Sequence, residues 1–186
     1  MAVRDGILAI LSLGSGYGLA LRDEIAARAP HRSDLNVGQV YSTLERLRRD
    51  GLVATGTTTD DNLPLYSLTP AGKEAVAAWL ERPSDADPRA WTDFLDQVLL
   101  GSSIPGTDWS ALLDRHLSNW QAARAEADAA PASDRIASAR RHWASAALAW
   151  LDDTRAVFTE TDPALPLRSI RPSRGRRPGQ TGLSTP

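Results

Sequence analysis

Residues 36–53 read Asn36-Val37-Gly38-Gln39-Val40-Tyr41-Ser42-Thr43-Leu44-Glu45-Arg46-Leu47-Arg48-Arg49-Asp50-Gly51-Leu52-Val53, and this stretch decides the fold. Its apolar residues Val40, Leu44 and Leu47 recur at i, i+4 and i+7, the spacing with which one face of a helix packs on a core. Asn36 is a favoured N-cap residue, and Gly51 stands where a left-handed residue ends a helix. The stretch therefore predicts a helix over residues 36–49, with a strand after Gly51.

The outward side of this predicted helix carries hydrogen-bonding side chains. Their donors and acceptors suit base edges and phosphates in a DNA groove, although a solvated polar face is the commoner use of such residues. Tyr41 either donates its hydroxyl to a phosphate or packs between helices. Arg48 either reaches DNA or lies over the hairpin, and Glu45 is spaced to form an ion pair with Arg49. The predicted DNA-binding residues are Asn36, Gln39, Tyr41, Ser42, Thr43, Arg46, Arg48 and Arg49.

The composition limits the classes of protein to which the chain can belong. With 186 residues, 42% of them apolar, it can bury the core of one domain or of two small ones. The absence of cysteine excludes disulfides, thiolate zinc sites and cysteine nucleophiles. Residues 1–82 carry 9 basic and 10 acidic side chains, residues 83–162 carry 7 and 13, and residues 163–186 carry 5 arginines and no acid. A DNA-reading domain is usually basic, so the balance over residues 1–82 counts against DNA binding.

The uncharged stretch at residues 7–21, preceded by Arg4, loosely resembles a signal peptide. However, Asp5 weakens the positive start, several glycines interrupt the apolar run, and the run is too short to span a bilayer. We therefore expect a buried helix followed by a Gly/Ser turn, in a cytoplasmic protein with no membrane partner.

Helix and turn signals divide residues 1–82 into six elements. Helices are predicted at 3–13, 17–28 and 36–49, strands at 52–55 and 63–68 around a polar tip, and a last helix at 70–81. Thr69-Pro70 supplies the cap and first residue of that last helix. This order predicts a winged helix-turn-helix, so the fold class is mainly α with a small β-hairpin.

Four short motifs follow one another in this region. They are Gly14-Ser15-Gly16-Tyr17-Gly18, then Gly38-Gln39-Val40-Tyr41, then Leu44 to Val53 with its Gly51-Leu52-Val53 end, and finally Tyr66-Ser67-Leu68-Thr69-Pro70-Ala71-Gly72. In this order they resemble the PadR family of bacterial transcriptional regulators over about the first 80 residues. The resemblance implies a two-fold dimer whose winged domains read a roughly palindromic operator in double-stranded DNA.

Two departures from the family pattern limit what the resemblance carries over. Leu19-Ala20 stands where the family often has Tyr-Glu. The hairpin tip, Thr59-Asp60-Asp61-Asn62, is acidic where many members carry Arg or Lys, and an acidic tip does not attract a polyanion. We therefore assign no DNA contact to the tip and expect Arg46, Arg48 and Arg49 to hold phosphates.

Residues 83–162 read as a linker, 83–88, followed by helices at 89–100, 108–129 and 133–159. Large and small apolar residues alternate at heptad-like spacing along the last two helices. Their stripes are Trp109, Leu113, His116, Trp120, Ala123 and Ala127, and then Ile136, Trp143, Ala147, Trp150 and Val157 or Phe158. Narrow stripes make a poor core alone, so we expect a second copy of the chain to supply the missing side. The family resemblance likewise implies a C-terminal helical dimerisation region.

Five of the six tryptophans lie at or beyond Trp91. Most are expected to fill the core and the dimer interface, the commoner use of tryptophan. The alternative is an aromatic pocket that stacks a small planar hydrophobic ligand, with Trp91, Phe94 and Trp143 as candidate ligand-binding residues. Some PadR-like regulators sense aromatic compounds in this way. Such a ligand releases DNA by binding better to the arrangement that does not bind DNA.

The rest of the sequence offers little chemistry. The three histidines lie far apart, and no phosphate loop, nucleophile elbow or carboxylate pair stands out. We therefore expect no enzyme, no metal site and no cofactor. Residues 163–186 are rich in Pro, Gly, Ser and Arg and are expected to be disordered, either as a solubilising tail or as a source of salt-sensitive DNA affinity.

These observations predict three parts: a DNA-binding domain at 1–82, a helical dimerisation and ligand-sensing region at 83–162, and a tail at 163–186. The predicted function is that of a homodimeric transcriptional repressor that inserts the 36–49 helix into the major groove and is released by an aromatic ligand. The alternative is a winged-helix adaptor that binds proteins rather than specific DNA, a use that the acidic hairpin tip fits.

Overall fold

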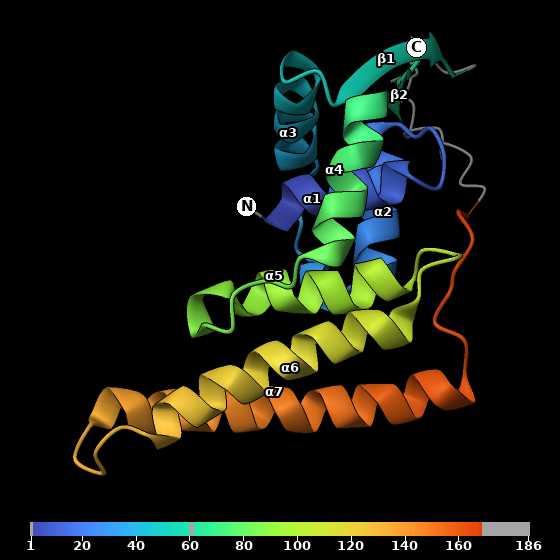
Figure 1. Ribbon diagram of the computed structural model, residues 1–186. Helices are drawn as coiled ribbons and strands as arrows, with labels where there is room; N and C mark the ends of the chain where they lie inside the picture. Colours follow the sequence, from blue (N-terminus) through green and yellow to red (C-terminus); the bar gives the residue numbers. More distant parts are fainter. Residues whose placement is uncertain (1, 60–61, 169–186) are drawn as a thin grey trace, which may run out of the picture.

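Two helical layers joined by one helix make up the fold of the computed structural model, which describes residues 2–59 and 62–168 (Figure 1). The first layer contains α1 (Ala2–Leu11), α2 (Gly18–Arg28), α3 (Val37–Arg49), β1 (Val53–Thr58), β2 (Pro64–Leu68) and α4 (Pro70–Glu81). The second contains α5 (Trp91–Asp96), continued by a π-helical segment (Gln97–Gly101), then α6 (Trp109–Asp128) and α7 (Arg135–Glu160). Among the described residues, no helix combines the length and the apolar character that crossing a membrane requires.

The first layer is a winged helix-turn-helix, as predicted. Strands β1 and β2 pair antiparallel from Val53 opposite Leu68 to Thr58 opposite Pro64, with an irregular register between Thr55 and Thr58. Gly16 forms an isolated antiparallel β-bridge to this hairpin, because its backbone N–H and C=O both bond to Tyr66, at 3.1 and 2.9 Å. The acidic residues 60–61 of the predicted tip lie outside the described residues.

Both predicted ends of α3 are confirmed. The Asn36 side chain accepts a hydrogen bond from the backbone N–H of Gly38 at 2.7 Å. Gly51 has a φ of 72°, and the N–H groups of Gly51 and Leu52 donate to the carbonyls of Arg48 and Leu47, at 3.1 and 3.0 Å. This pair of bonds satisfies carbonyls that the helix end leaves open.

Hydrogen bonds join the start of α4 to the turn that ends α3. The Thr69 hydroxyl donates to the Gly51 carbonyl at 2.7 Å and accepts from the Gly72 N–H at 3.1 Å. The Thr69 N–H donates to the Leu52 carbonyl at 3.0 Å. Gly72 approaches that carbonyl so closely that a Cβ atom there would lie 2.1 Å from the Leu52 oxygen.

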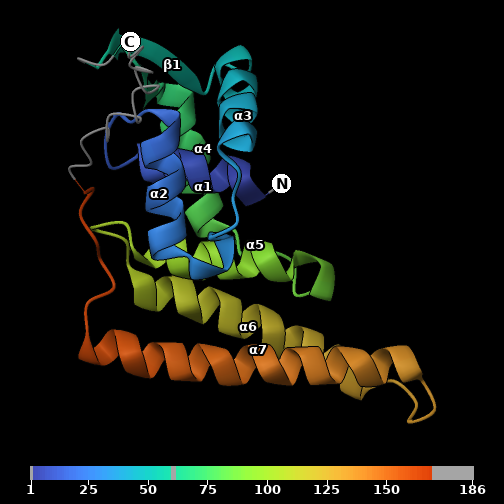
Figure 2. The same ribbon diagram turned by 180° about the vertical axis from the view of Figure 1, so that it is seen from behind.

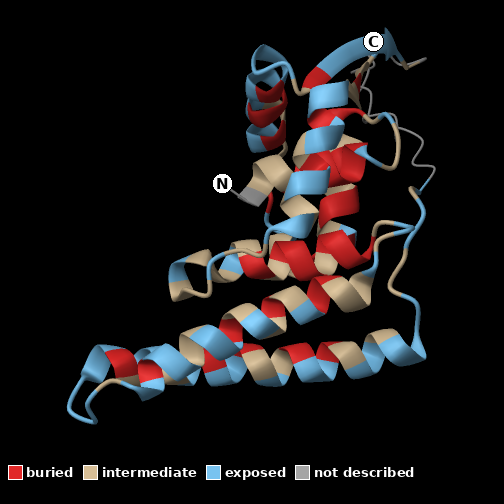
Figure 3. Cartoon of the chain, viewed as in Figure 1, coloured by how far each residue is buried: buried red, intermediate tan, exposed pale blue. Residues whose placement is uncertain are grey.

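Two hydrophobic cores meet along the helix that joins the layers (Figure 3). The first core gathers buried residues of α1, α2 and α3, and it also contains Leu100. The second lies between this joining helix and the α6–α7 hairpin and contains Phe94 and Val98. Side chains of one helix thus enter both cores, so the boundary predicted after residue 82 divides the elements but not the packing.

Helix α7 packs on α6 through a face that coincides only in part with the predicted stripe: Ala147 is fully buried, and Trp150 and Phe158 pack against the second core. Small and medium side chains make the contact, namely Ala137, Ala144, Ala147, Leu151 and Thr154. The larger residues beside them stay accessible: Ile136 is 65%, Trp143 39% and Val157 58% exposed. The α6 stripe, by contrast, points into the core as expected, with Leu113, His116 and Trp120 fully buried.

Residues 163–168 differ from the disordered tail that the composition predicts. They leave the end of α7 and run back beside the first layer, as the orange trace in Figure 2 shows. The Leu165 N–H donates to the Ser103 carbonyl at 2.9 Å, and Leu167 packs against the first core. The rest of the predicted tail, residues 169–186, lies outside the described residues.

Candidate DNA interface

Four polar side chains of α3 form one exposed stripe, which we call the recognition face: Gln39, Ser42, Arg46 and Arg49. Their spacing of i, i+3, i+7 and i+10 places them on one side of the helix. The Ser42 hydroxyl donates to the Gln39 carbonyl at 3.0 Å. Within the described part of the chain, the Gln39 amide and the Arg49 guanidinium make no hydrogen bond, so their donors are available to a ligand.

The opposite side of α3 fixes this face in place. Val40, Leu44 and Leu47 are fully buried in the first core. The cap at Asn36 and the lock between Gly51 and Thr69 hold the two ends of the helix. A recognition face on a packed and capped helix needs little reordering to enter a groove.

Thr43 does not lie on the recognition face, although it was a predicted DNA-binding residue. Its side chain is buried, with 4% of the residue exposed, and its hydroxyl accepts a hydrogen bond from the Arg46 guanidinium at 3.1 Å. Thr43 therefore restricts where the Arg46 side chain can point.

Tyr41 packs between helices, which is one of its two predicted roles. Its ring lies against Gly18 at the start of α2, where an added Cβ atom would come within 2.6 Å of the ring. The glycine of the first sequence motif thus makes room for the tyrosine of the second. The ring is half-buried against the first core.

Arg48 is held by Glu45 rather than free on the surface. Its guanidinium makes two hydrogen bonds to the Glu45 carboxylate, at 2.7 and 3.1 Å. These bonds hold the pKa of Glu45 below its usual value. The predicted pairing of Glu45 with Arg49 is therefore wrong: the carboxylate takes the arginine three residues away, and Arg49 stays free.

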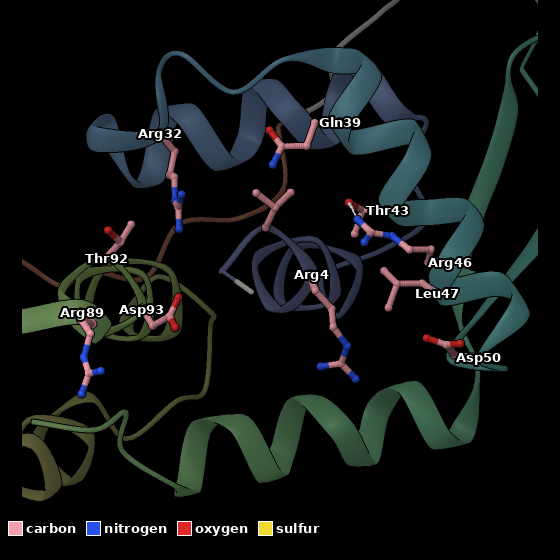
Figure 4. Close-up of a pocket in the computed structure, with 11 residues that line it drawn as sticks. Arg4, Arg32, Gln39, Thr43, Arg46, Leu47, Asp50, Arg89, Thr92 and Asp93 are labelled. Atoms are coloured by element: carbon pink, nitrogen blue, oxygen red, sulfur yellow. Dashed lines mark hydrogen bonds between the residues drawn. The ribbon is translucent and has the colours of Figure 1, made fainter. Parts of the chain in front are cut away.

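A basic cleft lies beside the recognition face, between α3, the first turn of α1 and the start of α5 (Figure 4). Its volume is about 710 Å³, and it is lined by Val3, Arg4, Arg32, Gln39, Thr43, Arg46, Leu47, Asp50, Arg89, Thr92 and Asp93. The sequence predicted no role here for Arg4, Arg32 or Arg89. No sequence pattern links them, because three separate elements bring them together.

The three candidate ligand-binding aromatics do lie together, but mostly inside the second core. The Trp91 ring is centred 5.2 Å from Phe94 and 5.2 Å from Trp143. Phe94 is completely buried and also contacts Trp120 and Trp150. A neighbouring cavity of about 490 Å³, between α6, α7 and the linker, is lined by Trp143 and Trp120 but not by Trp91 or Phe94.

Comparison with known proteins gives a family and a set of similar structures. Residues 7–78 match the Transcriptional regulator PadR-like family. The structure of Bacillus subtilis PadR in complex with operator DNA is 18% identical, over 84% of this chain and 99% of that chain, with a TM-score of 0.44. The same protein in complex with p-coumaric acid is 18% identical, over 86% and 99%, with a TM-score of 0.42. A PadR-like transcriptional regulator from Bacillus cereus is 18% identical, over 85% and 99%, with a TM-score of 0.37. A comparison with curated protein sequences found no match.

Proposed function

We propose that the chain is a sequence-specific repressor, because residues 7–78 match the Transcriptional regulator PadR-like family. It acts in the cytoplasm as a homodimer that binds a palindromic operator, with one α3 helix in the major groove of each half-site. The observation that carries this proposal is the recognition face: four exposed polar side chains on a helix whose other side is fully buried.

Each residue of the recognition face has a role that its chemistry suits. The Gln39 amide can pair with an adenine edge, and the Arg46 guanidinium with a guanine edge. Ser42 and Arg49 suit phosphates and the groove wall. Asn36 caps the helix, Thr43 restricts Arg46, and Tyr41 supports α3 through α2. The wing strands offer no cationic side chain to a phosphate, because residues 53–68 contain no Lys or Arg.

The exposed stripe of α7 supports the homodimer. Ile136, Trp143 and Val157 are separated by multiples of seven residues, the repeat that aligns side chains along one seam of a helix pair. Large apolar side chains along one seam lose contact with water when a second copy covers them. The two α7 helices would then set the distance between the two recognition faces.

The cavity beside Trp143 supports the second part of the proposal, release by a small planar ligand. Trp120 and Trp143 offer aromatic surface to the cavity, while Trp91 packs behind Trp143 and Phe94 behind Trp91. A ligand that binds here acts on DNA only if it favours one relative arrangement of the helices over another.

A binding selection tests the proposed function. The purified chain is incubated with genomic fragments at near-physiological salt, and retained fragments are sequenced. We expect enrichment of one palindromic element, and a mass in solution of two chains by light scattering. Enrichment of no element, with retention that salt abolishes, would favour the protein-binding adaptor instead.

Substitutions in the recognition face then locate the interface. Arg46→Ala and Gln39→Ala should each weaken binding to the selected element by a factor of about 5–150, the range for loss of one base contact. Arg135→Ala is the matched control, because it removes an equally exposed arginine from α7. If Arg46→Ala weakens binding to unrelated DNA as much as binding to the selected element, Arg46 contacts a phosphate rather than a base.

A further inference from the structure

Residues 163–168, which we call the strap, meet an arginine buried in the first layer. The guanidinium of Arg28 in α2 donates to the carbonyls of Leu165 and Pro166, at 2.8 and 2.9 Å. It also donates to the Ser103 carbonyl at 3.1 Å and to the Glu24 carboxylate at 2.9 Å. The Arg28 and Glu24 side chains are only 1% and 2% exposed. One guanidinium therefore joins α2, the end of the joining helix and the strap.

The strap also binds the second oxygen of the Glu24 carboxylate. Arg168 donates to Glu24 at 2.6 Å and to the Asp23 carbonyl at 2.9 Å. Between these contacts, Leu167 lies against the first core, 3.2 Å from where a Cβ atom at Gly14 would be. Without the strap, Arg28 would lose two of its acceptors and Glu24 one of its two cationic partners, and a buried charge with too few partners is costly.

A second ionic contact ties the layers together elsewhere. Asp96, at the end of α5, is buried and accepts from His31 at 2.8 Å and from Arg32 at 2.6 Å. His31 and Arg32 lie in the turn that leads from α2 towards α3. This contact joins the layers through α5, whereas the strap joins α2 to the end of α7. Arg115 of α6 also donates to the Leu80 carbonyl of α4 at 3.1 Å, so the strap is one of several separate contacts that resist rotation about the joining helix.

We propose that the strap is a positioning element that fixes the winged layer, and with it the recognition face, relative to α7. Its partner is the surface of α2 formed by Glu24 and Arg28, together with the apolar site that receives Leu167. The consequence for DNA rests on the proposed function: two half-sites one helical turn apart, about 34 Å, demand a defined separation of the two α3 helices. A fixed layer does not lose orientational freedom again on binding, so the strap raises operator affinity.

The test releases the strap in the full chain. Leu167→Asp with Arg168→Glu places one carboxylate against the first core and another beside Glu24. The control, Arg171→Glu with Ser173→Asp, makes the same charge change of −3 further along the chain, so it accounts for any salt-sensitive affinity of the arginine-rich end. Arg168→Ala is a milder second variant, because the Arg168 side chain is 53% exposed and its loss should leave folding intact.

Spin labels report the position of the winged layer directly. The chain has no cysteine, so Glu74→Cys on α4 and Asp152→Cys on α7, both exposed, can be labelled selectively. Dilution with unlabelled protein leaves one labelled chain in each dimer. We expect the distribution of distances between these labels to broaden roughly twofold when the strap is released. Operator affinity of the Leu167→Asp, Arg168→Glu variant should fall roughly fivefold or more below that of the control variant at Arg171, and Arg168→Ala should show a smaller fall relative to wild type.

Two results would overturn the proposal. An unchanged distance distribution in both strap variants would mean that the strap does not fix the layer. A broadened distribution with equal or tighter operator binding would mean that the fixed arrangement does not favour DNA. If the wild-type chain selects no operator, the proposed function fails, and the label distances alone decide whether the strap positions the winged layer.

Discussion

At the scale of single residues, one carboxylate controls how many unpaired arginines the exposed side of α3 presents. Glu45 engages Arg48 in two hydrogen bonds on the exposed side of the helix. We predict that Glu45→Gln tightens binding to the operator by roughly two- to fivefold, because it frees Arg48 and removes a negative charge near the phosphates. The slope of log K against log salt should become more negative by about 0.9, the value for one added phosphate contact.

Fluorescence anisotropy titrations over a range of salt concentrations check this prediction. Glu74→Gln is the matched control, since it removes an exposed carboxylate from α4, away from the recognition face. An equal gain in the control would show a general effect of net charge. An unchanged salt slope in Glu45→Gln would show that Arg48 does not reach a phosphate.

The recognition face itself is largely predictable from the sequence, because helical periodicity alone separates it from the buried side. Gln39, Ser42, Arg46 and Arg49 follow from that argument, and all four are exposed. The same argument also placed Thr43 on the outward side, which is wrong, because Thr43 lies on the border between the two sides and is buried. Its burial depends on how closely the rest of the first layer approaches α3. The partner of Glu45 was also unpredictable, because helical spacing allows both Arg48 and Arg49.

At the scale of elements, the contact between α3 and α4 depends on a missing side chain. A Cβ atom at Gly72 would lie 2.1 Å from the Leu52 carbonyl oxygen, which also accepts the Thr69 N–H. We predict that Gly72→Ala lowers the free energy of unfolding by roughly 1–3 kcal/mol, the usual cost of forcing an extra group into a packed site. Urea denaturation followed by circular dichroism measures this change.

Gly56→Ala provides the comparison for that measurement. A Cβ atom at Gly56 would meet its nearest neighbour, the Leu65 carbonyl oxygen, at an ordinary 3.8 Å. This variant should therefore stay close to wild type. Similar losses in the two variants would mean that the α3–α4 contact adjusts and does not require glycine.

From the caps and turn residues in the sequence, one can predict where the elements begin and end. The same residues do not reveal the whole face with which α7 meets α6. The N-cap at Asn36, the glycine at 51 and the Thr69-Pro70 start each act locally, so the sequence alone reveals them. The face of α7 depends on which side chains allow a close approach to α6. Besides the predicted Ala147, Ala144 and Leu151 are buried on that face, and the large Trp143 is left at its edge. A heptad count cannot distinguish these two arrangements.

At the scale of the whole molecule, the connection between the layers was not predictable from composition. The strap has the proline content of a tail, but Arg28 and Ser103, which hold it, lie 137 and 62 positions before Leu165. Likewise, Leu100 enters the core of the first layer although it follows the predicted linker. Contacts of this kind depend on the tertiary arrangement, and no local sequence pattern predicts them.

The stability of the whole molecule should depend on pH through His116. This side chain is fully buried beside Phe94, and neither ring nitrogen has a hydrogen-bond partner among the described residues. Burial, with a smaller contribution from Arg115, lowers the pKa of His116 from 6.5 to about 4. Between these two values the unfolded chain binds a proton that the folded chain does not. The contribution of His116 to stability is therefore complete above pH 6.5 and is lost as the pH falls towards 4.

We predict that this loss amounts to about 2 kcal/mol at pH 5, from the two pKa values and the linkage relation. His116→Leu removes the titrating group at similar volume, so the variant should lose less stability between pH 7.5 and pH 5 by that amount. At pH 7.5 it should be as stable as wild type or more so, because a buried polar ring without partners is replaced by an apolar one. Urea unfolding of both proteins at each pH, at one protein concentration, measures the difference. Parallel losses in the two proteins would mean that His116 gains a partner or reaches water when it is protonated.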